Sequence, residues 1–277
     1  MRKPPLTYYL VYPLVKGLLY LWSLLPMPIL HLQSSIFAFL IHRVIGYRKA
    51  VVLDNLRHAF PEKSEAEIRH IAKGFYLHFC DVIVETVKLM SISAKNLKRR
   101  MRHVNPEVLP EMTAHGGGGI AVFAHYANWE WLGAGMGLQL PFSTVGVYKV
   151  LSSQVFDRLM LHIRTRLGND MITMEQTLRE SLKRLKSPCY IAFLGDQSPP
   201  GHGSHYFTAF LGRPAPVHLG IAAISLKMNV PLYYFDIRRE RRGHYAVELV
   251  QIPHQDLLPY TKESCYALTE RHVEYLE

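Results

Sequence analysis

A histidine and a glutamate five positions apart, His125 and Glu130, are the residues of this sequence whose type and spacing could do chemistry. A carboxylate bound to one imidazole nitrogen fixes the tautomer, raises the basicity of the other nitrogen and stabilises the imidazolium form. Such a pair suits a general base that takes the proton of an alcohol. The sequence has no Gly-x-Ser-x-Gly motif and no cysteine beside this histidine, so the predicted nucleophile is a hydroxyl group of the substrate.

The elements that must position this pair are a strand and a helix. The apolar run 120–124, preceded by the glycines 116–119, predicts a buried strand. Side chains five positions apart on one helix point about 140° apart and would not converge. We therefore expect His125 in the turn after the strand, Asn128 as the helix N-cap and Glu130 in the first helical turn, from where its carboxylate can fold back onto the imidazole. The sequence alone leaves open that both residues merely cap a helix.

Polar residues also follow two other predicted strands. Lys149 comes directly after the strand predicted at 143–148, and Asp196 and Gln197 come after the buried strand predicted at 189–194. Polar groups at the carboxyl ends of strands line the crevice of open α/β sheets. Lys149 could contact a phosphate group or a developing oxyanion there, although an ammonium group does not replace the bidentate fork of an arginine.

Two arginines and two loop histidines are further candidates. Arg164 and Arg166 are two positions apart, so they cannot share one face of a helix, and both could be ordinary surface arginines. His202 and His205 lie in a loop rich in Gly and Pro that could cover a site. They have no carboxylate or cysteine partner at metal-ligand spacing, so we predict no metal site.

The order of the predicted elements indicates an α/β domain behind a helical segment. Residues 47–100 carry helical periodicity, and Ser64 and Glu67 resemble a capping box. Strands and helices alternate after the His125 motif. Strands are predicted at 143–148, 189–194, 231–237 and 245–252, and helices at 154–167, 176–185, 217–228 and from about 260 onward. We divide the chain into an N-terminal segment 1–46 and a domain 47–277, in which a helical part 47–104 precedes the α/β core 105–277.

The N-terminal segment has two apolar stretches, 8–25 and 29–45. Prolines and a lysine interrupt them, and neither supplies the roughly 20 uninterrupted apolar residues of a clean membrane span. The tyrosines, Trp22 and the flanking basic residues suit a membrane interface, and no signal-peptide cleavage site follows. The sequence predicts a helical anchor that enters the bilayer or lies on it; a buried helical hairpin is the alternative.

Composition indicates an anionic partner. The net charge is +10, while 49% of the residues are hydrophobic and 19% are charged. A membrane surface, an acidic carrier or a nucleic acid would each satisfy this charge. The basic residues are scattered without an aromatic-interleaved motif, which argues against nucleic acid. The basic run 95–102 could hold anionic head groups. The three cysteines are far apart, which argues against a disulfide framework and favours a reducing compartment.

The motif His125-Tyr-Ala-Asn-Trp-Glu130 resembles the His-x4-Asp/Glu signature of glycerolipid acyltransferases. Its Asn-Trp-Glu form is similar to the branch that adds secondary acyl chains to lipid A, the lauroyl and myristoyl acyltransferases. Other segments match in the same order and extend the resemblance over most of the chain. They are Tyr148-Lys149, Arg164-Thr-Arg166-Leu-Gly168, Gly195-Asp196-Gln197 and Phe207-Thr-Ala-Phe-Leu-Gly212.

The resemblance implies a mixed sheet flanked by helices and an acyl transfer without metal or organic cofactor. The donor would be acyl carrier protein, and the acceptor a hydroxyl of a lipid A precursor at the cytoplasmic face of the inner membrane. His125 would be the general base, Glu130 its partner and Arg164 a ligand of an oxyanion or phosphate. The predicted substrate-binding residues are Asn128, Lys149, Arg166, Asp196 and Gln197.

Two departures from the family pattern and several alternatives accompany this resemblance. The family usually has arginine at the position of Lys149, and usually continues past residue 277 with a segment that contains Trp and Arg. The same chemistry could acylate a lysophospholipid, an aminolipid or another glycolipid. Outside enzymes, a basic membrane-surface scaffold would explain the charge and the N-terminus, but would give His125, Glu130 and Asp196 no role.

Overall fold

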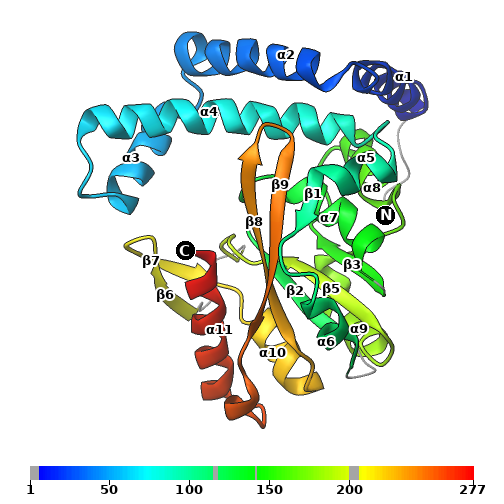
Figure 1. Ribbon diagram of the computed structural model, residues 1–277, viewed down its shortest axis with the longest axis vertical. Helices are drawn as coiled ribbons and strands as arrows, with labels where there is room; N and C mark the ends of the chain where they lie inside the picture. Colours follow the sequence, from blue (N-terminus) through cyan, green and yellow to red (C-terminus); the bar gives the residue numbers. More distant parts are fainter. Residues whose placement is uncertain (1–5, 115–117, 141, 200–205) are drawn as a thin grey trace.

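The computed structural model describes residues 6–114, 118–140, 142–199 and 206–277. Within them, seven strands form one sheet in the order β1-β9-β8-β2-β5-β3-β4, and neighbouring strands are parallel except β8 and β9 (Figure 1). A mixed sheet flanked by helices was the predicted architecture, and it is confirmed. The strands are β1 Met101–His103, β2 Gly119–Phe123, β3 Ser143–Tyr148, β4 Asp170–Thr173, β5 Cys189–Leu194, β8 Leu232–Arg241 and β9 His244–Ile252.

Strand β2 lies in the middle of the sheet, between β8 and β5. Ile120 pairs with Leu232 on one side and with Ile191 on the other. All five residues of β2 are buried. Parallel strands that are covered on both faces are continuous apolar runs, which is why the sequence pattern predicted β2 and β5 well.

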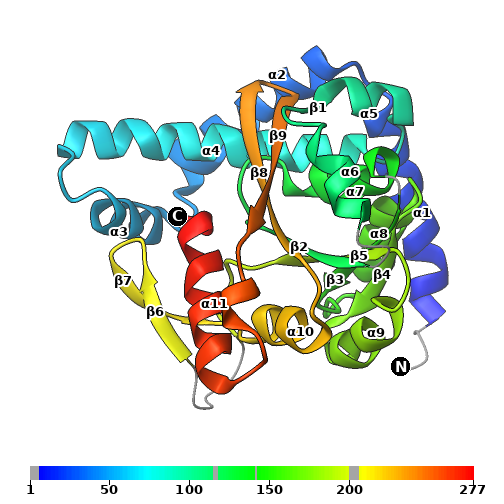
Figure 2. The ribbon, with the colours of Figure 1, turned by 60° about the horizontal axis from the view of Figure 1, so that its bottom comes forward.

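Helices cover both faces of the sheet (Figures 1 and 2). One hydrophobic core joins the sheet to α4, α5, α6, α7 and α8, and the other joins it to the end of α9, to α10 and to α11. Their bounds are α4 Glu65–Lys88, α5 Ala94–Arg100, α6 Val108–Ala114, α7 Trp129–Gln139, α8 Gln154–Thr165, α9 Thr177–Arg184, α10 Gly220–Met228 and α11 Lys262–Leu276. The capping box expected at the start of α4 is present, because Ser64 and Glu67 exchange hydrogen bonds.

The N-terminal segment forms helices that pack along α4 at one end of the molecule (Figure 1). They are α1 Leu6–Ser23 and α2 Met27–Phe39, which has a π-helical continuation Leu40–Ile45. The first helix after this segment, α3 Lys49–Ala59, packs on α4 as well. By length and composition, Met27–Ile45 is apolar enough to cross a membrane, and only 17% of its most apolar window is buried in the protein. The helical character expected for both apolar stretches is confirmed.

Three features of the fold escaped the sequence analysis. Strands β1 and β4 have three and four residues, too few to show a period. A separate antiparallel hairpin, β6 Tyr206–Phe210 and β7 Arg213–Val217, precedes α10. The helix predicted from residue 217 begins later, at Gly220, because Val217 pairs with Tyr206 at the end of this hairpin. Glycines 116 and 117, and the loop residues 200–205 with His202 and His205, lie outside the described residues.

Candidate active site

The turn between β2 and α7 carries His125. Asn128 caps α7 as predicted, because its Oδ1 accepts a hydrogen bond from the backbone N–H of Trp131 at 2.9 Å. Ala127, just before the cap, has a φ of +46°, a left-handed conformation that costs energy for a residue with a Cβ atom. The turn therefore holds a strained shape directly beside the histidine.

Asp196, and not Glu130, is the carboxylate on the imidazole of His125. Its Oδ1 lies 2.8 Å from Nδ1 of the ring, and its Oδ2 accepts the backbone N–H of His125 at 3.0 Å. The register of the sheet explains this contact: Phe123 of β2 pairs with Leu194 of β5, and each of the two polar residues follows two positions later. Parallel strands bring these positions to one edge of the sheet, as expected for Asp196.

Glu130 instead forms a bidentate ion pair with Arg164 of α8. Its Oε2 lies 2.9 Å from Nε of the guanidinium and its Oε1 lies 2.5 Å from Nη2. The expectation that the Glu130 carboxylate folds back onto the imidazole is therefore corrected, because the carboxylate turns toward α8. Burial acts to lower the pKa of Arg164, but the pair with Glu130 outweighs it and the net shift is upward. Arg164 is thus a cation that Glu130 holds in a fixed orientation.

The contact with Asp196 defines the tautomer of His125. A carboxylate accepts hydrogen bonds, so Nδ1 carries the proton and Nε2 is the basic nitrogen. The amide nitrogen of Gln197 lies 3.5 Å from Nε2, a long contact that a substrate hydroxyl could replace. The ring of Trp129 stands edge-on to the imidazole, with centroids 5.3 Å apart. The imidazole is therefore held in one orientation, with Nε2 on the side of Gln197.

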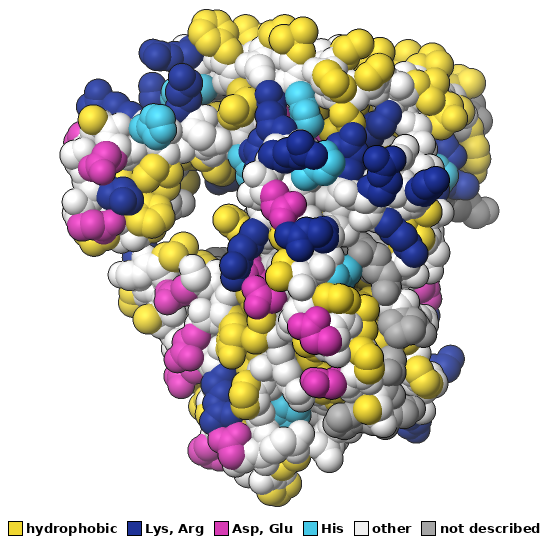
Figure 3. Space-filling view, viewed as in Figure 1, with side chains coloured by type: hydrophobic (Ala, Val, Ile, Leu, Met, Phe, Trp, Pro, Cys, Tyr) yellow, Lys and Arg dark blue, Asp and Glu magenta, His cyan; other side chains and the backbone are white. Residues whose placement is uncertain are grey.

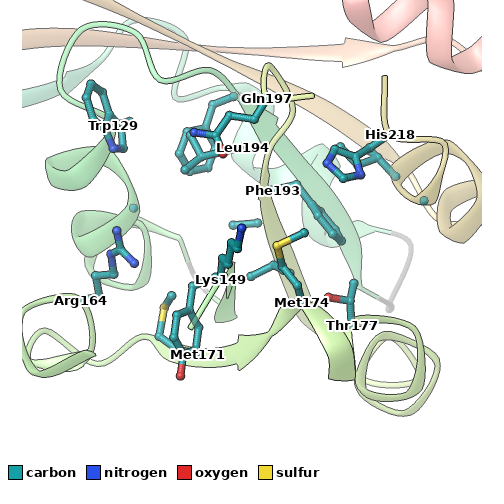
Figure 4. A pocket seen from close by; sticks show the side chains of 18 of the residues that line it. Trp129, Lys149, Arg164, Met171, Met174, Thr177, Phe193, Leu194, Gln197 and His218 are labelled. Carbon is teal, nitrogen blue, oxygen red and sulfur yellow. The ribbon is translucent and has the colours of Figure 1, made fainter. Parts of the chain in front are cut away.

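His125 lines a cavity of about 700 Å³. Glu130, Arg164, Lys149 and Gln197, which are four of the predicted site residues, line it too. In Figure 4, Trp129 and Arg164 lie on one side of this cavity, His218 lies on the other and Lys149 lies between them. Most of the other lining side chains are apolar, among them Phe123, Ala134, Met136, Met171, Met174, Leu178, Phe193, Ile221 and Ile224.

Three predicted substrate-binding residues are not among the residues that line the cavity. One is Asp196, whose carboxylate binds His125 instead. Arg166 is not among the residues that line the cavity, and it donates hydrogen bonds to the carbonyl of Leu89 at 2.7 Å and to that of Ile92. It therefore ties the end of α8 to the connection after α4. Asn128 is fully buried beneath the turn, where its Nδ2 donates to Glu85. Arg166 and Asn128 therefore hold the surrounding elements together and do not line the cavity.

His218 and Lys227 line the cavity but were missed by the sequence analysis. His218 precedes α10, and Lys227 lies near the end of this helix, where its amine sits over the ring of Tyr260. A lone histidine or lysine at a helix boundary gives no spacing signal, so only the fold could reveal them. No group of three or more His, Cys, Asp or Glu residues suited to a metal ion occurs among the residues the structure describes.

Comparison with known proteins decides the family. The family model described as "Bacterial lipid A biosynthesis acyltransferase" matches residues 3–277. This chain belongs to that family. It is also similar to a protein of Escherichia coli (strain K12) named lipid A biosynthesis lauroyltransferase, with 24% identity over 237 residues, which cover 86% of this chain and 76% of the relative.

Membership in the lipid A biosynthesis acyltransferase family makes this chain an acyltransferase of lipopolysaccharide biosynthesis, in agreement with the motif resemblance. An acyltransferase of this kind needs an acyl donor and a lipid acceptor. Among the described residues, the cavity beside His125 combines an imidazole of fixed orientation with a largely apolar wall.

Proposed function

We propose that this acyltransferase moves a fatty acyl chain from the thioester of acyl carrier protein to a hydroxyl group of a lipid A precursor, with His125 as general base. One observation carries this proposal: Asp196 holds the proton of His125 on Nδ1, while the ring borders a largely apolar cavity. A base without its own nucleophile beside it suits transfer between two bound substrates.

In the proposed reaction, Nε2 of His125 takes the proton of the acceptor hydroxyl while its oxygen attacks the thioester carbonyl carbon. Asp196 stabilises the imidazolium that forms. When the tetrahedral intermediate collapses, the carbon–sulfur bond breaks, and the imidazolium returns the proton to the departing thiolate. The products are the ester and the free thiol of the carrier, and no oxidant, reductant or cofactor is consumed.

Arg164 and Lys149 are the proposed cationic ligands of the oxyanion or of acceptor phosphate groups. The bidentate pair uses Nε and Nη2 of Arg164, so Nη1 of the guanidinium lies outside the pair with Glu130. Because Glu130 fixes the plane of the guanidinium, this remaining nitrogen is preorganised, which is the condition for stabilising charge that develops in a transition state. Lys149 borders the same cavity from the end of β3.

The proposed attachment to the membrane uses the outer face of α1 and α2. Leucines on this face are among the most exposed apolar side chains of the protein: Leu10 is 76% exposed, Leu14 63% and Leu32 63%. Figure 3 shows an apolar band along this end, with basic side chains gathered just beneath it. Lys95, Lys98 and Arg99 of α5, with Arg102 and Arg241, form what we call the basic belt, and all five are exposed.

An apolar face next to the basic belt suits an enzyme that rests on an anionic bilayer. We propose that α1 and α2 lie on the cytoplasmic leaflet of the inner membrane, because α2 packs lengthwise against α4 and presents its opposite face outward. The same positive charge favours approach of an acidic acyl carrier protein.

Transfer assays with each combination of acyl donor and lipid acceptor test the proposed reaction. Labelled acyl groups would be offered on acyl carrier protein or on coenzyme A, to lipid A precursors, lysophospholipids, aminolipids and other glycolipids. Transfer from the carrier to the lipid A precursor supports the proposal. Preference for another acceptor would reassign the substrate, and no transfer from acyl carrier protein to any acceptor by folded protein would contradict the proposed reaction.

Sedimentation with lipid vesicles tests the proposed attachment. Leu14→Glu with Leu32→Glu should abolish binding to vesicles that contain anionic lipid, and Lys98→Glu with Arg99→Glu should weaken it and reduce its salt dependence. Phe207→Glu is the matched control, because this exposed aromatic residue lies on β6, away from α1 and α2 (Figure 1). Equal binding by all variants would refute the assignment of this face.

A further inference from the structure

The carboxylate of Glu85, on α4, is completely buried and joins three distant parts of the chain. Its Oε2 accepts hydrogen bonds from Nδ2 of Asn128 at 2.6 Å and from the hydroxyl of Tyr245 at 2.7 Å. Its Oε1 lies 2.9 Å from Nε2 of His31 on α2. No sequence motif includes Glu85, and no step of the proposed acyl transfer requires an acidic residue at this position.

The backbone of Glu85 contacts the same region of the site. Its carbonyl oxygen accepts the indole N–H of Trp131 at 2.6 Å, so Glu85 contacts both the N-cap and the first turn of α7. His78 lies two helical turns earlier on the same face of α4, and its Nε2 lies 3.0 Å from the carbonyl oxygen of Ala127. One face of α4 thus contacts Ala127, Asn128 and Trp131, which follow His125.

Burying a carboxylate at a core position costs free energy. A carboxylate without water is unfavourable unless hydrogen bonds satisfy it, and an apolar side chain is often at least as stabilising there. Burial, and then the neighbouring carboxylate of Glu85, raise the pKa of Tyr245, which keeps its hydroxyl protonated as a donor. The cluster is therefore well satisfied, and its arrangement fixes one orientation of the Asn128 amide.

That orientation matters for the site. Oδ1 of Asn128 must face the N–H of Trp131 to cap α7, so Nδ2 needs an acceptor on the other side, and Glu85 supplies it. Without this acceptor, the strained backbone at Ala127 loses one of its restraints and can relax. His125, two residues before Ala127, would then shift against Asp196.

We propose that Glu85 is a positioning residue of this acyltransferase, which acts through Asn128 to hold the turn of His125 in its productive shape. The inference rests on the proposed function, because it assigns Glu85 a part in the same acyl transfer. Since His31 belongs to α2, the same carboxylate also connects this turn to the helix with the exposed apolar face.

Three substitutions test the role of Glu85. Glu85→Met keeps the length of the side chain and removes both acceptors; kcat should fall roughly 10- to 100-fold while KM changes by less than about threefold. Glu85→Gln should keep most of the activity, because its amide oxygen can face Asn128 and Tyr245 while its NH₂ group faces His31. Tyr245→Phe is the milder comparison, since it removes one donor to the carboxylate but leaves the acceptor that Asn128 needs, so its kcat should fall much less than that of Glu85→Met.

A second route covers the case in which Glu85→Met does not fold. Asn128→Ser keeps a good helix cap, but the serine is too short to reach Glu85. The same loss of kcat is expected. Wild-type kcat per folded molecule in Glu85→Met, or in Asn128→Ser, would overturn the proposal, as would a loss in Tyr245→Phe equal to that in Glu85→Met.

Nuclear magnetic resonance of protein labelled at the histidine rings separates this proposal from the proposed function. The ring signals of His125 should move in Glu85→Met and Asn128→Ser and should move less in Tyr245→Phe. If wild-type protein fails to transfer acyl groups but these shifts occur, the positioning role stands and the reaction is misassigned. If the signals do not move, Glu85 does not position His125.

Discussion

Asp196 holds His125 by both its ring and its backbone, although 71 residues separate the two in the sequence. The carboxylate that lies close in the sequence, that of Glu130, binds Arg164 instead. The site therefore contains two separate pairs of side chains: a histidine bound by an aspartate, and a guanidinium held in plane by a glutamate. A separate prediction follows from each pair.

Asp196→Asn should reduce kcat at least about 100-fold. The amide can present its NH₂ group to Nδ1, which then carries no proton, so Nε2 becomes protonated and cannot act as a base. Steady-state kinetics with labelled donor measures the effect. Asp170→Asn is the control, since this exposed aspartate on the edge strand β4 pairs with Arg184. Nearly unchanged turnover in Asp196→Asn would show that the tautomer of His125 does not limit the reaction.

Glu130→Ala and Arg164→Ala should be strongly non-additive. If Glu130 acts by fixing Arg164, the double variant should turn over about as slowly as either single variant, and the free energy of unfolding should fall by about 1–3 kcal/mol in Glu130→Ala, which leaves a part-buried cation unpaired. A double-mutant cycle on kcat and on denaturant unfolding measures both. Rate losses that simply multiply would instead indicate that Glu130 acts on His125 directly.

Local sequence patterns identified the turn that carries His125, whereas the sheet topology determined which side chains contact it. The strand at 119–123, the cap at Asn128 and the polar residues at strand ends all follow from short-range sequence signals. The choice between two carboxylates does not. It depends on the pairing of β2 with β5, and a parallel neighbour cannot be deduced from the spacing along the chain.

Gly133→Met should shift the donor preference toward shorter acyl chains. Gly133 lies on α7 and lines the cavity, and a Cβ atom there meets no atom within 4 Å, so the new side chain would extend into open space. Competition between labelled donors of different lengths measures the shift. Gly74→Met is a matched control, because Gly74 lies on α4 with equally open surroundings and does not line the cavity. An unchanged preference would place the acyl chain elsewhere.

The stability of the protein should decrease as the pH falls from about 6.5 to about 4, in part because of His272 on α11. Burial lowers the pKa of this histidine from 6.5 to about 4. In that window the unfolded chain binds a proton that the folded chain does not, so the free energy of unfolding falls with falling pH, by roughly 3 kcal/mol for this group. Above pH 6.5 the contribution is constant.

Urea unfolding between pH 4 and 7.5 measures this dependence. His272→Gln should flatten the curve below pH 6.5, whereas His70→Gln, at an exposed position of α4, should leave its slope unchanged. Parallel curves for wild type and His272→Gln would contradict the assignment.

Buried polar residues were the least predictable part of the site. Helical periodicity placed α4 but gave no reason for an acidic residue at Glu85, since its partners come from three segments far apart in the sequence. Arg166 looked like a ligand beside Arg164 and instead binds backbone carbonyls. Which of two nearby arginines reaches the cavity depends on how α8 is rotated against α4 and α7, and amphipathic spacing alone does not fix that rotation.

The acyl-transfer rate of His125→Ala tests the central claim most directly. Purified wild type and variant would be compared with labelled acyl carrier protein and a lipid A precursor, and circular dichroism and thermal unfolding would establish that both are folded. Loss of the general base predicts a rate at least about 100-fold lower, with a similar melting temperature. A folded His125→Ala enzyme that still transfers acyl groups at nearly the wild-type rate would contradict the mechanism.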